Sequence, residues 1–168
     1  MTLLQILQGT PAHVWALLAG LIVLGVSQSR PRTLGSTRVA LLPLVLIALS
    51  LAGVASSFGI GAAALLAWLA GLGVALAAAP RLLPAPRARW TERRDAVHVA
   101  GSWLPLALVV GLFAIKYVAG ASLAMHPALS HETLFAVPVG FAYGLFSGTF
   151  AARGWQMWRA RPVRAVAA

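Results

Sequence analysis

Five apolar stretches of about 20 residues each constrain this chain more than any other feature of its sequence. An α-helix rises about 1.5 Å per residue, so about 20 residues cross the roughly 30 Å hydrocarbon core of a bilayer. In lipid, a helix satisfies its backbone hydrogen bonds within the segment. We therefore predict an all-α integral membrane protein with five transmembrane helices, at about residues 11–28, 39–58, 60–79, 102–125 and 133–152.

The composition agrees with this prediction. Of the 168 residues, 60% are hydrophobic and only 10% are charged, whereas soluble domains carry about 25% charged residues. The length suits a single membrane domain spanning residues 1–168. No positive residue precedes the first apolar stretch, so we expect it to remain as a helix and not to be a cleaved signal peptide.

The basic residues predict the orientation. All the arginines fall in three segments, namely the first loop, a basic loop at residues 80–101 and a basic tail at residues 153–168. Five crossings place these segments on one side, and positive residues are retained in the cytoplasm. We predict an N-out/C-in multi-pass protein of the bacterial inner (plasma) membrane. Its arginines are expected to meet anionic lipid headgroups, and nucleic acid is not an expected partner.

The basic loop contains an alternating pattern. Residues 89–91 and 96–99 alternate on either side of a four-residue turn, Glu92 to Asp95, which favours a small cytoplasmic β-hairpin between the third and fourth helices. A basic loop without regular structure is the alternative.

Several short runs resemble a known family. They are Leu4-Gln-Ile-Leu-Gln-Gly-Thr-Pro, Gly101-Ser-Trp-Leu-Pro-Leu, Ile115-Lys-Tyr and Tyr143-Gly-Leu-Phe-Ser-Gly. Together they resemble an uncharacterised family of small bacterial polytopic inner-membrane proteins, a domain of unknown function, over nearly the whole chain. A weaker similarity, a hairpin followed by Gly-Ser and a helix, extends to membrane proteins named after a cytochrome c maturation locus. The resemblance implies the topology and no activity.

Lys116 is the one charged residue inside a predicted span. It lies nine residues before Met125, about 13 Å below the outer boundary, where a charge costs about 2.5–3.5 kcal/mol on insertion scales. Tyr143 has a similar depth on the antiparallel fifth helix, so Tyr143, Ser147 or a carbonyl freed by a proline are the expected partners. Lys116 is either an ion, proton or anion site or a structural lysine, bonded inside the bundle or snorkelling outward.

Gly140, Gly144 and Gly148 recur at a spacing of four on the fifth helix, which places them on one face and lets another backbone approach. The pattern is typical of helix packing within the chain, with homodimerisation as the alternative.

The outer face carries His13, Met125, His126, His131 and Glu132, whose side chains can ligate a metal or haem. Loops also carry such residues because they are solvated, and we expect no cofactor and no metal here. There are no cysteines, which excludes thiolate chemistry.

Enzyme signatures are absent. Glu92, Asp95 and Glu132 are the only acidic residues, and none lies in a predicted span, so there is no intramembrane carboxylate pair for acid–base chemistry. We expect a non-enzymatic structural or assembly partner in a membrane complex. The alternative is a small transporter or channel that uses Lys116, as a dimer because one five-helix unit has no room for an inverted repeat.

Overall fold

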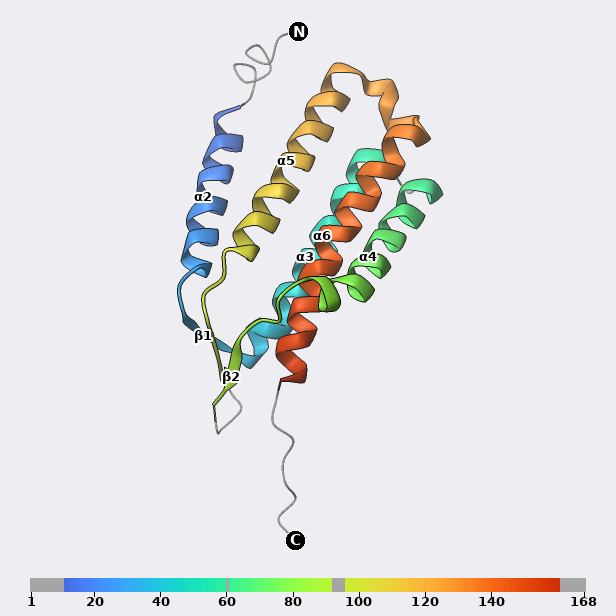
Figure 1. Cartoon of the computed structure of the whole chain (residues 1–168). Helices are drawn as coiled ribbons and strands as arrows, with labels where there is room; N and C mark the ends of the chain where they lie inside the picture. The colour runs from blue at the N-terminus through green and yellow to red at the C-terminus, as the bar shows by residue number, and fades with distance from the viewer. Residues whose placement is uncertain (1–10, 60, 92–95, 161–168) are drawn as a thin grey trace.

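The computed structural model describes residues 11–59, 61–91 and 96–160, and within them the chain is mostly helical. The five α-helices of the described part are α2 (Ala12–Gln28), α3 (Ser36–Phe58), α4 (Ala62–Leu82), α5 (Leu104–Met125) and α6 (Thr133–Arg159). A short 3₁₀ helix, η1 (Pro127–His131), joins α5 to α6. Successive helices run in alternating directions along the bundle (Figure 1).

Four of these helices, α3 to α6, are long and apolar enough to cross a membrane. The remaining helix, α2, has 17 residues and is about 26 Å long at 1.5 Å per residue. It lies beside α5 along the bundle (Figure 1). The structure thus provides four of the five predicted spans at full length and a shorter apolar helix for the first.

The helices form two groups. One consists of α3, α4 and α6, with α4 and α3 both packed on α6, and the other is the pair α2 and α5 (Figure 1). Half of the apolar stretch of α6 is buried, against 6% of that of α5. The core therefore lies in the three-helix group, around the buried side chains of Val54, Phe58, Trp68 and Tyr143, and α5 is peripheral.

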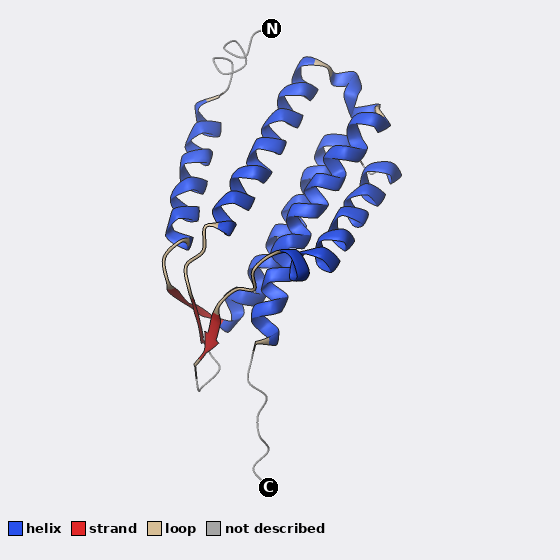
Figure 2. Cartoon of the chain, in the orientation of Figure 1, coloured by secondary structure: helices blue, strands red, loops and turns tan. Residues whose placement is uncertain are grey.

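A three-stranded antiparallel sheet closes the end of the bundle that carries the arginines (Figure 2). Its strands are β1 (Arg32–Gly35), β2 (Ala88–Trp90) and β3 (Ala96–Val99), in the order β1-β3-β2. The pairing of β2 with β3 confirms the strands of the predicted hairpin, whose turn, residues 92–95, lies outside the described residues. Strand β1, from the first loop, is an addition that the sequence did not predict. The sheet therefore ties the α2–α3 connection to the α4–α5 connection.

A hydrogen bond fastens this sheet to α6. The indole nitrogen of Trp90 donates to the carbonyl oxygen of Met157 at 2.9 Å, and the rings of Trp90 and Trp158 meet edge to face with centroids 6.3 Å apart. Both connections and the end of α6 are thereby held together.

Three helices extend beyond the predicted apolar spans. Helix α3 begins at Ser36, α4 continues to Leu82, and α6 continues to Arg159, so the first residues of the predicted basic tail, including Arg153 and Arg159, are helical. The reason is physical. Hydropathy marks where an apolar segment ends, whereas a helix continues for as long as its backbone can bond to itself.

Candidate functional site

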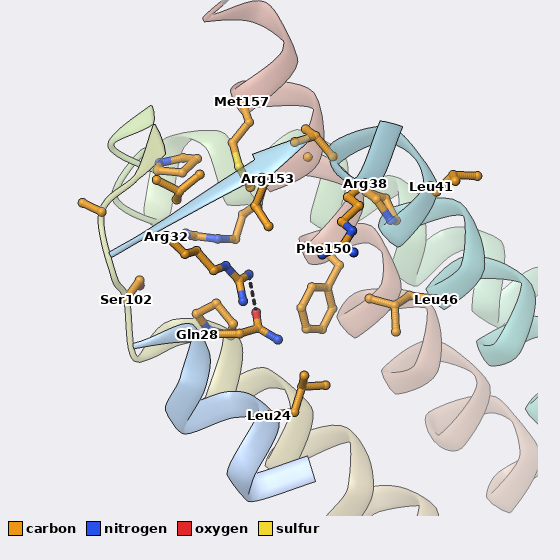
Figure 3. Close-up of a pocket in the computed structure, with 18 of the residues that line it drawn as sticks. Leu24, Gln28, Arg32, Arg38, Leu41, Leu46, Ser102, Phe150, Arg153 and Met157 are labelled. Atoms are coloured by element: carbon orange, nitrogen blue, oxygen red, sulfur yellow. Dashed lines mark hydrogen bonds between the residues drawn. The ribbon is translucent and has the colours of Figure 1, made fainter. Parts of the chain in front are cut away.

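The clearest candidate site is a cavity of about 540 Å³ at the sheet end of the bundle, between α2, α3, α5 and α6 (Figure 3). We call it the arginine pocket. Its wall is largely apolar and includes Leu24, Leu34, Val39, Leu41, Val45, Leu46, Val99, Phe150 and Met157. A volume of this size is typical of small-molecule sites, which combine apolar walls with a few placed polar groups.

Four arginines line the same cavity: Arg30, Arg32, Arg38 and Arg153. Figure 3 shows the side chains of Arg32, Arg38 and Arg153 among the residues that line the pocket. Arg153 is only 7% exposed, and its guanidinium donates to the carbonyl oxygen of Pro84 at 3.2 Å. Arg32 donates to the side-chain oxygen of Gln28 at 3.1 Å. The pocket thus joins a cationic cluster to an apolar wall.

The arginines come together because separate elements are pinned at this end. Arg32 sits in β1 directly opposite Val99 of β3, while Arg38 lies in the first turn of α3 and Arg153 near the end of α6. Gly154 permits the close approach of α3 and α6, since a Cβ added there would come 2.5 Å from the ring of Pro43. The contacts that hold the sheet at this end of the bundle therefore also position the arginines of the pocket.

The described lining of the pocket carries positive charge from its arginines. No carboxylate is present among its lining residues in the part of the chain that the structure describes. Burial lowers the pKa of Arg32 below its ordinary value, because desolvation disfavours the charged form. Arginine nevertheless stays protonated in proteins. The cavity is therefore suited to an anion.

Lys116 lies apart from the polar side chains of the core. Its side chain is exposed on α5, and no hydrogen bond joins it to another described residue. Tyr143 and Ser147 are each 2% exposed inside the three-helix group, and the Ser147 hydroxyl donates to the Tyr143 carbonyl oxygen at 2.8 Å. The pairing of Lys116 with Tyr143 or Ser147 stays a prediction, because similar positions along two helices do not by themselves place side chains on facing sides.

The glycines of α6 lie against α4. A Cβ added at Gly140 would come 2.6 Å from the carbonyl oxygen of Ala64, and one at Gly148 would come 2.6 Å from that of Leu72. At Gly144 an added Cβ would overlap the carbonyl oxygen of Trp68. This face is covered within the chain, as in the first of the two alternatives that the spacing left open.

His126, His131 and Glu132, which were expected at the outer face, are exposed around η1. The side chain of His13 lies outside what the structure describes. Among the described side chains, no group of three histidines, cysteines or acidic residues lies close enough to hold a metal ion.

The arginine pocket itself was not predicted from the sequence. Its four arginines come from the first loop, the start of α3 and the end of α6, and no spacing rule connects such segments. The one available signal was the density of arginine directly after the first apolar stretch, which we interpreted as a signal of topology and of contact with anionic lipid headgroups, and not as a pocket.

The chain belongs to the family of unknown function DUF6622, whose family model matches residues 1–168. This agrees with the expected resemblance to an uncharacterised family, whereas the weaker similarity to proteins of a cytochrome c maturation locus stays a prediction. No curated protein and no solved structure matches the chain.

Proposed function

We propose that this DUF6622 member is a non-enzymatic assembly partner of another bacterial inner-membrane protein, which it contacts through the face of α5 that carries Lys116. The observation that carries the proposal is the exposure of Lys116 on a helix long and apolar enough to span a membrane. A charge at this depth costs about 2.5–3.5 kcal/mol unless it is compensated.

In the part of the chain that the structure describes, no acidic side chain forms an ion pair with Lys116. Its three acidic residues are Glu92 and Asp95, both in the basic loop, and Glu132, beyond η1. A second copy would bring another lysine and no intramembrane carboxylate. A partner helix with an aspartate or glutamate near its middle supplies the missing charge, and α5, of whose apolar stretch only 6% is buried, has room for it.

The proposal includes five crossings with the N-terminus outside and the C-terminus in the cytoplasm. Support comes from the end of the bundle that holds the sheet, where Arg30, Arg38, Arg81 and Arg159 all lie near helix ends. Positive residues are retained in the cytoplasm, so this end is assigned to the cytoplasm. Helix α2, at about 26 Å, is at the short end of the range that spans a bilayer.

Anion transport is the second candidate, and one relationship favours it. Lys116 follows Pro105 by eleven residues, about three helical turns, so the two residues share one face of α5. Pro105 lines the arginine pocket. A cation midway through the membrane above a cationic pocket is an arrangement that an anion pathway would use, and it predicts anion flux in reconstituted vesicles that Lys116→Met abolishes.

Purification in mild detergent, followed by mass spectrometry, tests the assembly proposal. Wild-type protein should retain a membrane protein whose spanning helix carries a carboxylate, and Lys116→Met should lose that protein while keeping its own thermal stability, because Met matches the length of the lysine stem. Capture of the same proteins by both variants would contradict the proposal.

The matched control moves the lysine without changing its depth appreciably. Val118 is 61% exposed and lies two residues further along α5, on a different side of the helix. The double substitution Lys116→Met with Val118→Lys keeps the charge in the membrane but should still lose the partner. Retention of the partner by this variant would mean that charge alone, and not the Lys116 face, is recognised.

A further inference from the structure

The arginine pocket carries a second inference, independent of Lys116. The pocket combines a cluster of arginines with an extended apolar wall. Few small anions would interact with both. A free inorganic anion would gain from the arginines but nothing from the wall, whereas an apolar ligand would gain from the wall but would leave the cations unpaired. An anionic amphiphile uses both.

The cationic part of the pocket is built for an oxyanion. Arg153 is more than nine-tenths buried, with a single hydrogen bond, to the carbonyl oxygen of Pro84, among the described residues. Guanidinium groups present a planar fork of donors that matches the paired oxygens of phosphate. With Arg32 and Arg38 lining the same cavity (Figure 3), more donors are available than the hydrogen bonds among the described residues use.

The level of the pocket along the bundle identifies the anion. Arg30 lies two residues beyond the end of α2, and Arg38 lies in the first turn of α3, where spanning helices meet the headgroup region. Leu24, one turn inside the end of α2, and Leu46, well within α3, extend the wall toward the hydrocarbon. The anions found at this level of a bilayer are lipid phosphates, and basic pockets between spanning helices bind such headgroups.

We propose that the arginine pocket is a binding site for an anionic phospholipid, with the lipid phosphate held by Arg32, Arg38 and Arg153 and the acyl chains laid along the apolar wall that includes Leu24 and Leu46. The bound lipid bridges the α2–α5 pair and the three-helix group, since the pocket is lined by both.

The test is a titration of purified protein in detergent, followed by native mass spectrometry, with dioleoyl phosphatidylglycerol and dioleoyl phosphatidylcholine. The two lipids share their acyl chains and differ in net charge. Phosphatidylglycerol should bind about tenfold more tightly, because the arginines repel the choline cation of phosphatidylcholine, whereas the glycerol headgroup carries no positive charge. Equal affinity for the two lipids would overturn the proposal.

Two further arms separate a lipid from free phosphate. Inorganic phosphate and glycerol phosphate carry the same anion without acyl chains, and neither should displace phosphatidylglycerol at concentrations near that of the lipid. Leu24→Gln changes an exposed side chain of α2. It should weaken the binding of phosphatidylglycerol and leave the binding of inorganic phosphate and glycerol phosphate unchanged. Displacement by glycerol phosphate at lipid-like concentrations would identify a soluble phosphate site and overturn the assignment to lipid.

Substitutions then localise the site. Arg38→Gln and Arg32→Gln should each reduce the preference for phosphatidylglycerol by about tenfold. Because Arg38 is exposed, Arg38→Gln should not disturb folding. It therefore tests the site even if Arg153→Gln, at a buried position, destabilises the protein. Arg81→Gln is the matched control, because Arg81 is exposed on α4 outside the pocket and donates to Ala77 of its own helix at 2.7 Å. An equal loss of preference in Arg81→Gln would show non-specific surface attraction and overturn the site.

Discussion

The indole nitrogen of Trp68 on α4 donates a 2.7 Å hydrogen bond to the hydroxyl of Ser50 on α3. Both side chains are buried, with exposures of 5% and 6%. The same hydroxyl lies 3.4 Å from the carbonyl oxygen of Tyr143 on α6, to which it donates. One small hydroxyl therefore links the three helices of the core.

Ser50→Ala should destabilise the protein by about 1–3 kcal/mol, because it leaves the buried indole N–H without an acceptor. The double variant Ser50→Ala with Trp68→Phe removes donor and acceptor together and should recover part of that loss in unfolding measurements. Ser56→Ala is the control, since Ser56 is exposed and bonds only to Gly53 in its own helix. Equal stability of Ser50→Ala and Ser56→Ala would show that the link contributes nothing.

Gly144→Ala should also destabilise the protein, by about 1–3 kcal/mol, because the added methyl overlaps the backbone of α4 at Trp68. Gly144→Leu should cost more, as lipid cannot relieve the overlap. Gly73→Ala is the matched control: no atom lies within 4 Å of its added Cβ, and alanine favours a helix by up to about 1 kcal/mol. Thermal unfolding in detergent measures all three, and wild-type melting of Gly144→Leu would mean that this face meets only lipid.

Single cysteines test the topology, because the chain has none of its own. In intact cells, an impermeant maleimide should label Ala12→Cys and Ser130→Cys, at the predicted outer ends of α2 and η1. Ser29→Cys, at the other end of α2, should be labelled only after the membrane is opened. Labelling of residues 12 and 29 from the same side would mean that α2 does not cross the membrane.

Different parts of the structure were predictable from the sequence to different degrees. The helices follow from hydropathy, which is a local property, and the β2–β3 hairpin follows from alternation over one short loop. Strand β1 does not, because Arg32 pairs with Val99, far away in the sequence. The extension of α6 through Arg153 was missed because polar residues mark the edge of the apolar stretch but do not stop a helix.

The candidate sites show the same division. The position of Lys116 near the middle of a predicted span could be counted from the sequence. The direction in which its side chain faces could not, since that depends on how α5 packs. The glycine face of α6 was visible as a spacing of four, whereas its partner Trp68 was not. The arginine pocket gathers residues of four helices and two strands, and only the folded chain brings Arg32 and Arg153 to the same cavity.

A charge-exchange experiment with designed helices tests the central claim most directly, namely that Lys116 recognises an intramembrane carboxylate. Energy transfer in vesicles would report association of the labelled protein with leucine-rich spanning peptides whose central residue is Glu, Gln or Lys. Wild-type protein should associate with the Glu peptide about tenfold more strongly than with the Gln peptide. Lys116→Glu should reverse the preference and select the Lys peptide. Equal association of wild-type protein with the Glu and Gln peptides, or an unchanged preference in Lys116→Glu, would contradict the account.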